Sequence, residues 1–343
     1  MSGYGGVLLF CGITYGIATN MPMHASMCVL FQHFTSSNRM RASSLSFLGQ
    51  SVVSIFLGLS YQKLTPLIGW RNTLRITSIY VLALGLPSSF FVKLKSMDAG
   101  DSKVGSGKQN VQIPTDQVVS TIGDKYQTNE KITNEEAATG QFVHGWLHFI
   151  KDYKVWCVAV AFYFPAMTWS VFWVNIVNFF ESVGLHGDEI LINMTVSIVA
   201  EIVGKTTLVL FIHRLPVQEV NLLIFLNISS SAVAAAFAFW PSKTVLLISS
   251  VFVGAGRGLY TVLPYVCAPI LLNKYHTDQA ITLAIMSTGL GYPIGSIPAG
   301  AIYEATNSYF YAFVANAMFC LFGATLLVVL QVHQHITEKK SVR

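Results

Sequence analysis

Charged side chains are scarce in this chain. Of its 343 residues, 11% are aspartate, glutamate, lysine or arginine, whereas 53% are hydrophobic. Soluble globular domains carry about 25% charged residues, so the composition excludes an ordinary soluble protein. The net charge of +5 is too small to identify a partner. The sequence has no basic stretch with interleaved aromatic residues, so we expect no binding to nucleic acid.

Paired cysteines and the short motifs of common enzymes are also missing. Five cysteines occur, none at CxxC spacing and all within apolar stretches: Cys11, Cys28, Cys157, Cys267 and Cys320. We interpret them as small buried hydrophobic residues and predict neither a disulfide framework nor a metal site. The sequence contains no GxSxG, HExxH or P-loop pattern. We therefore expect that the protein is not an enzyme and needs no cofactor.

Long apolar runs, by contrast, are abundant. A helix needs about 20 mainly apolar residues to cross a bilayer. Nine stretches meet this length, at residues 5–31, 43–63, 74–92, 155–180, 190–212, 219–240, 244–272, 279–303 and 309–332. The sequence therefore predicts an all-α, polytopic membrane protein with about nine transmembrane helices.

One long polar stretch, at residues 93–154, separates three of these spans from the other six. It is rich in Ser, Thr, Gln, Asn, Gly and Lys, a composition typical of a largely disordered linker. Its segment 142–150 is predicted to form a short amphipathic helix at the membrane surface. Lysine and arginine gather on the linker side of the membrane, which predicts a cytoplasmic linker and C-terminus. The predicted parts are the N-terminal bundle 1–92, the linker, the six-helix bundle 155–333 and a cytoplasmic tail 334–343.

Two opposite charges lie in the middle of the span 190–212. Glu201 and Lys205 are four residues apart, so a helix places them on one face with the acid on the favourable N-terminal side. A charge near the bilayer centre costs about 2.5–3.5 kcal/mol, so both side chains should face protein or water. They form either a functional site or a structural salt bridge that locks two helices. Arg257, between glycines in a later span, is either a substrate anchor or a partner of Glu201 or of backbone carbonyls.

Aromatic and small residues inside the spans allow two interpretations each. The aromatic candidates either line a cavity for a larger or aromatic carboxylate, or only pack; they are Trp169, Phe172, Trp173, Tyr260 and Tyr265. Gly291 and Gly295 have GxxxG spacing, which favours close contact between two helices.

Four segments of the sequence share a pattern with one family: HFTSSNRMRASSLSFLGQSVVS at 33–54, GWR at 69–71, AEIVGK at 200–205 and HR at 213–214. They resemble, in order, the junction of the fourth and fifth helices, the start of the sixth and two parts of the eighth in the monocarboxylate transporters. These belong to the major facilitator superfamily. In the eighth helix the family carries an Asp and, four residues on, an Arg, where this chain has Glu201 and Lys205. Arg257 departs from the pattern, because the family's tenth helix often has an apolar or aromatic residue there.

The resemblance implies a truncated major-facilitator fold that lacks the first three of twelve helices. It also implies a plasma-membrane transporter that moves small monocarboxylates or related organic anions with a proton by alternating access. Lys205 would attract the carboxylate, Glu201 would carry the proton, and Arg257 would be a second anchor. Implied partners are the carboxylate, the proton, the lipid bilayer and a single-span ancillary membrane protein. The alternative is a non-transporting, transporter-derived membrane protein with a partner-binding role or none.

Overall fold

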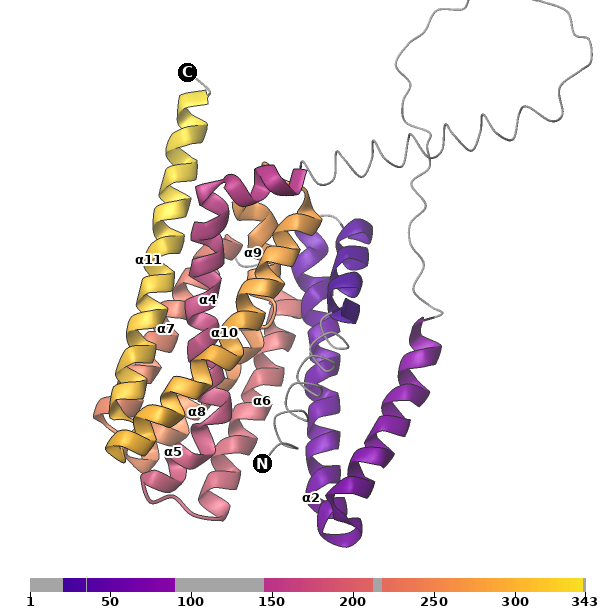
Figure 1. The fold of residues 1–343 in the computed structure, drawn as a ribbon, viewed down its shortest axis with the longest axis vertical. Helices are drawn as coiled ribbons and strands as arrows, with labels where there is room; N and C mark the ends of the chain where they lie inside the picture. The colour runs from indigo at the N-terminus through magenta and orange to yellow at the C-terminus, as the bar shows by residue number, and fades with distance from the viewer. Residues whose placement is uncertain (1–20, 35, 90–144, 212–217, 342–343) are drawn as a thin grey trace, which may run out of the picture. The chain divides into compact units, whose positions relative to one another are not determined.

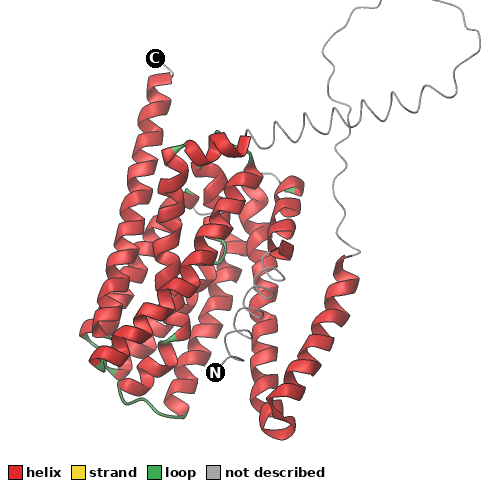
Figure 2. Ribbon diagram, viewed as in Figure 1, coloured by secondary structure: helices red, strands yellow, loops and turns green. Residues whose placement is uncertain are grey.

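The computed structural model of the chain describes residues 21–34, 36–89, 145–211 and 218–341. All regular structure in these residues is helical (Figure 2), which confirms the predicted all-α class for them. The chain divides into two units, Met1–Lys93 with Tyr153–Arg343, and Leu94–Asp152. In the second unit the described part is a helix at residues 145–151, within which Trp146 and Phe149 make an edge contact at 5.6 Å.

Several helices of the first unit have the length and composition of membrane spans. Five of the described helices qualify, α4 (Tyr153–Val174), α6 (Asp188–Phe211), α7 (Glu219–Phe239), α10 (Thr277–Thr306) and α11 (Phe310–Ser341). A sixth span results if α8 (Lys243–Tyr260) and α9 (Leu263–Leu271), bent by 47°, count as one. This set is that of an integral multi-pass membrane protein. The other three predicted spans fall on residues 5–31, described only from residue 21, and on α2 (Ser36–Ser89).

The helix α2 consists of two arms that meet at a sharp reversal (Figure 1). Gly69 lies at the break with a φ of 77° and a ψ of 155°, a backbone conformation that glycine adopts without a steric penalty. Trp70 and Arg71 follow, and the guanidinium of Arg71 lies 5.1 Å from the centre of the Trp70 ring. The GWR segment therefore marks the turn between the two spans predicted at 43–63 and 74–92.

Two of the spans predicted as continuous are broken in the structure. The span predicted at 155–180 forms α4 and α5 (Ile176–Ser182), with Asn175 at the break. The amide of Asn175 donates to the carbonyl oxygen of Ser296 at 3.5 Å, so the break is tied to α10. The span predicted at 244–272 bends between α8 and α9, where Pro264 lies in the first turn of α9. A proline there costs no hydrogen bond, because the first amides of a helix have no partner within it.

Small residues bring α4 and α10 into direct backbone contact. A Cβ added at Gly291 would lie 2.7 Å from the carbonyl oxygen of Tyr163, and one added at Gly295 would overlap the backbone of Met167. The hydroxyl of Ser170 also donates to the carbonyl oxygen of Tyr292. The close packing predicted from the GxxxG spacing is thus confirmed.

Aromatic side chains fill the core where α4, α5, α7 and α11 meet. The rings of Phe179 and Phe313 lie 4.6 Å apart, and Phe237 is 5.3 Å from each of them. All three side chains are buried. Edge-to-face arrangements of this kind add to the stabilisation from burial alone, so this cluster holds the helices of the C-terminal bundle together around α4.

Candidate functional site

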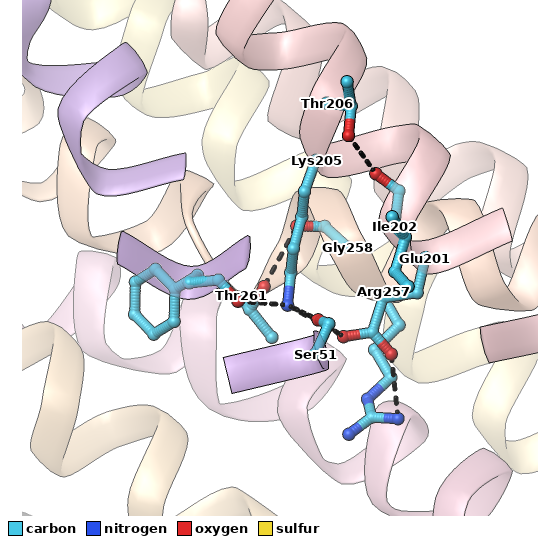
Figure 3. Close-up of polar contacts among 9 residues, drawn as sticks. Ser51, Glu201, Ile202, Lys205, Thr206, Arg257, Gly258 and Thr261 are labelled. Carbon is cyan, nitrogen blue, oxygen red and sulfur yellow. Dashed lines mark hydrogen bonds and ion pairs between the residues drawn. The ribbon is translucent and has the colours of Figure 1, made fainter. Parts of the chain in front are cut away.

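Glu201 and Lys205 lie on one face of α6, as their spacing predicts. The ammonium nitrogen Nζ of Lys205 is 2.8 Å from Oε1 of Glu201 (Figure 3). Glu201 is 5% exposed and Lys205 is 1% exposed, so neither charge faces outward from the helix bundle. Both residues lie in the middle of α6, between Asp188 and Phe211.

Lys205 uses all its hydrogen-bonding capacity within the protein. An ammonium group has three donors, and Nζ donates to Oε1 of Glu201, to the hydroxyl of Ser51 at 2.6 Å and to the carbonyl oxygen of Phe47 at 3.2 Å. Ser51 in turn donates to Glu201 at 2.7 Å. In this arrangement Lys205 has no donor left for a ligand, and it fastens the first arm of α2 to α6.

Arg257 of α8 reaches the other oxygen of the same carboxylate. Its Nη1 is 3.1 Å from Oε2 of Glu201, so one acid lies between two bases (Figure 3). The Arg257 side chain is 25% exposed, far more than Lys205. Its guanidinium carbon lies 3.2 Å from the centre of the Trp173 ring, a cation–π contact that covers one face of the group. Of the two interpretations open for Arg257, pairing with Glu201 is present, and it leaves part of the side chain accessible.

Glycines at the contact between α6 and α8 allow Arg257 to come close enough to Glu201 for an ion pair. A Cβ added at Gly258 would lie 2.6 Å from the carbonyl oxygen of Glu201, and one at Gly204 would lie 2.9 Å from that of Ala255. Only glycine permits such an approach of two backbones. The hydroxyl of Ser197 donates to the carbonyl oxygen of Ser250 at 3.0 Å along the same contact. Neighbouring glycines thus set the distance at which Arg257 meets the acid.

A cavity of about 240 Å³ adjoins this cluster. Its lining comes from residues 21–33, from α2, α4, α8, α9 and α10, and from the turn between α8 and α9. The lining residues are Met23, Phe47, Gln50, Trp169, Trp173, Arg257, Thr261, Tyr265, Ile285, Thr288, Gly289 and Tyr292. Among these described residues Arg257 alone carries a charge. Glu201 and Lys205 are not part of the lining. The cation that faces the cavity is therefore Arg257, and Glu201 lies behind it.

The aromatic candidates divide between lining and packing. Trp169, Trp173 and Tyr265 line the cavity, as the first interpretation expects. Tyr260 is buried and donates its hydroxyl to the carbonyl oxygen of Phe162 at 2.7 Å. Phe172 packs 5.9 Å from Phe313 in the aromatic core. For the last two the packing interpretation holds.

Three residues of the site escaped the sequence analysis. Ser51 lies within the quoted segment 33–54 and Tyr292 within the predicted span 279–303, but one serine or tyrosine in an apolar helix carries no spacing signal. Phe47 was likewise not singled out, and its ring stacks on Tyr265 with centroids 5.8 Å apart. These residues become visible only when separate helices are placed side by side. Within the described residues no group of three or more His, Cys, Asp or Glu side chains could hold a metal ion.

The arrangement is suited to an anion. The cluster of one acid and two bases carries a net positive charge, and its accessible member is an arginine at the wall of an otherwise uncharged cavity. A guanidinium offers paired donors that match the two oxygens of a carboxylate. Glu201, by occupying one edge of Arg257, is positioned to exchange with such a ligand.

No protein-family model matches the chain, and no curated protein matches it. The resemblance to the monocarboxylate transporters therefore rests on the four quoted segments. Of these, HR at 213–214 lies outside the described residues, as do residues 93–144 of the predicted linker.

Proposed function

We propose that this protein is a secondary active transporter of small monocarboxylates or related organic anions, driven by a proton and working by alternating access. The observation that carries the proposal is Arg257, a partly exposed arginine on the cavity wall whose partner acid is buried behind it. Ionisable groups inside a membrane bundle commonly mark substrate and proton paths. The resemblance to the monocarboxylate transporters of the major facilitator superfamily points to the same activity.

The roles of the three charged residues follow from their contacts. Arg257 binds the substrate carboxylate, because it is the cation that the cavity exposes. Glu201 carries the proton: when the substrate takes the Arg257 edge, Oε2 of Glu201 loses its cation and accepts a proton. Lys205 and Ser51 keep Oε1 in place. This assigns to Arg257 the anchoring role that the sequence analysis gave first to Lys205.

The charge of the site stays constant through this exchange. In the empty site one carboxylate faces two cations, which leaves one positive charge. In the loaded site the substrate brings one negative charge and the proton neutralises Glu201, so one positive charge remains. The same net charge in both states favours movement of substrate and proton together, since loading adds no charge that would have to cross the bilayer.

The wider architecture is part of the same proposal. We infer nine transmembrane helices arranged as in a major-facilitator fold, with residues 93–154 and the C-terminus in the cytoplasm and the protein in the plasma membrane. The distribution of lysine and arginine supports this orientation. A single-span ancillary membrane protein would be a partner, as the resemblance implies.

One observation favours the alternative, a transporter-derived protein that does not transport. All three donors of Lys205 are satisfied within the protein, which is what a structural lock between two helices requires. Uptake measurements in oocytes that express the full chain decide between the two. Transport predicts uptake of a radiolabelled monocarboxylate that rises at acidic external pH. Uptake at the uninjected background for every carboxylate tried, with the protein at the cell surface, would favour the alternative.

A further inference from the structure

The wall of the cavity is aromatic on several sides. Five of its lining side chains are aromatic, Phe47, Trp169, Trp173, Tyr265 and Tyr292, and they come from α2, α4, α9 and α10. The remaining polar lining residues, such as Thr261 and Thr288, are uncharged. A ligand in this cavity would contact aromatic rings from several helices, and the one cation of the lining that it could contact is Arg257.

The ring of Trp173 limits the directions from which a ligand can reach the guanidinium of Arg257. This ring lies 3.2 Å from the guanidinium carbon of Arg257, so one face of the guanidinium is covered. Nη1 is directed to Glu201 at 3.1 Å, and among the described residues no second carboxylate pairs with Arg257. A ligand carboxylate therefore approaches in the plane of the guanidinium, at an edge, and its attached group extends along the aromatic wall.

The size of the cavity limits the ligand. At about 240 Å³ it lies below the 300–1,000 Å³ that is typical for pockets of drug-sized ligands. One six-membered ring with a short carboxylate arm suits such a space. A carboxylate of two or three carbons would leave most of the aromatic wall uncontacted, and the gain from burial grows with the apolar area that leaves water.

We propose that the preferred substrates are carboxylates that carry one aromatic ring, with the carboxylate on the edge of Arg257 and the ring among the aromatic side chains of the wall. Trp173 belongs to the wall that the substrate ring contacts, and its own ring also covers one face of the Arg257 guanidinium. This inference rests on the proposed function, since it takes the cavity to be the substrate site. It adds a preference for substrates with an aromatic ring, which the four segments that resemble the monocarboxylate transporters do not predict.

Binding to the purified full chain in detergent tests the inference, with acetate, lactate, phenylacetate and cyclohexylacetate as probes. Cyclohexylacetate has the skeleton of phenylacetate without a π face. We expect phenylacetate to bind about tenfold more tightly than acetate and about threefold more tightly than cyclohexylacetate. Equal affinities for phenylacetate and acetate, or for phenylacetate and cyclohexylacetate, would overturn the aromatic preference while the proposed function stands. No binding of any carboxylate would overturn both.

A matched pair of variants tests the role of Trp173. Trp173→Leu should lower the ratio of phenylacetate to acetate affinity about threefold, because one ring of the wall is lost, and Trp173→Phe should restore part of it. Trp240→Leu is the control, because Trp240 is exposed and not part of the cavity, and it should leave the ratio unchanged. A general loosening of the site would weaken both ligands and preserve the ratio, and that result would overturn the role of Trp173. If Trp173→Leu does not fold, the comparison of probes on the unmodified chain still decides the substrate class.

Discussion

Arg257 of α8 and Glu201 of α6 form an ion pair at 3.1 Å, and the same carboxylate is held from its other oxygen by Lys205 at 2.8 Å. The two bases differ in access, since Lys205 is enclosed and Arg257 faces a cavity. Desolvation makes an unpaired buried charge expensive, so the shared acid stabilises both cations. The asymmetry between the two bases leads to distinct predictions for each of them.

Replacing Arg257 by methionine should abolish uptake but allow the protein to reach the cell surface. The change removes the cation of the cavity, while Glu201 keeps its contacts with Lys205 and Ser51. Surface biotinylation and uptake are measured on the same cells, because a folding defect would mimic a lost site. The matched control is Arg75→Met, an exposed arginine that contacts Asn72 and should keep normal uptake. Unchanged uptake in Arg257→Met would remove Arg257 from the substrate path.

Single neutralisations of the buried pair should both lower surface expression, but unequally. Breaking a buried pair costs about 3–5 kcal/mol, because one charge is left without a partner. Glu201→Gln leaves two cations unpaired, whereas Lys205→Met leaves Glu201 with Arg257. We therefore expect the larger loss of surface protein for Glu201→Gln. Equal losses in quantitative blots would contradict the shared-acid arrangement.

The double variant Glu201→Gln/Lys205→Met separates transport from a structural lock. Glu201→Gln alone leaves both Lys205 and Arg257 without a carboxylate, whereas the double variant leaves only Arg257 without one. Surface expression of the double variant should therefore recover toward that of the unmodified protein. Uptake should stay at background, because the proton carrier is gone. Recovery of uptake together with expression would mean that the pair only joins α2 to α6.

The contact between α6 and α8 should not tolerate a methyl group at Gly258. The added Cβ would lie 2.6 Å from the carbonyl oxygen of Glu201, so the two backbones must move apart and Arg257 moves with them. Gly258→Ala should reduce both the yield of folded protein in detergent and the uptake per surface molecule. The control is Gly300→Ala in α10, where the new Cβ would lie more than 4 Å from every neighbouring element of the described chain and helix propensity predicts a gain of about 0.5–1 kcal/mol. Equal yields of the two variants would contradict the close approach.

Local patterns were sufficient for some features of the site and insufficient for others. The Glu201–Lys205 pair follows from four-residue spacing on one helix, and the close contact of Gly291 and Gly295 with α4 follows from GxxxG spacing. The greater solvent exposure of Arg257 compared with Lys205 cannot be predicted from the sequence pattern, because it depends on which helices surround the cavity. The position of Ser51 beside Lys205 is of the same kind, since it requires α2 and α6 to be neighbours.

The bends of the spans show a further limit of sequence patterns. Hydropathy predicts a continuous helix at 244–272, because every residue from Gly258 to Leu272 is apolar or weakly polar. The structure bends by 47° between α8 and α9, and this bend places Tyr265 and Arg257 on the same cavity. Pro264 in the first turn of α9 is compatible with a change of direction, but the angle depends on the tertiary packing of α9.

The orientation predicted from lysine and arginine can be tested without any structural change to the helices. A protease site inserted near Thr128 should be cut only after the plasma membrane is permeabilised, because residues 93–154 are expected in the cytoplasm. An insertion in the loop at 183–187, between α5 and α6, serves as the control and should be cut in intact cells. Cleavage near Thr128 in intact cells would place the linker outside the cell and contradict the proposed topology.

A contact between the helix at residues 21–33 and the start of α10 offers a test of alternating access. Nε2 of His24 and the hydroxyl oxygen of Thr282 are hydrogen-bonded at 2.7 Å, and the same hydroxyl oxygen lies 2.7 Å from the carbonyl oxygen of Asp278. The contact joins two parts of the chain that belong, in the proposed function, to opposite halves of the transporter.

Alternating access requires the two halves to move against each other, so a covalent link at this contact should stop transport. The variant His24→Cys/Thr282→Cys is made in a Cys28→Ser background, because the Cys28 thiol lies 3.7 Å from His24. A short bifunctional thiol reagent should then reduce uptake to background, and reduction should restore it if the linker contains a disulfide. The single-cysteine variants, treated in the same way, should retain uptake. Full uptake by the cross-linked protein would mean that these two segments do not separate during the transport cycle.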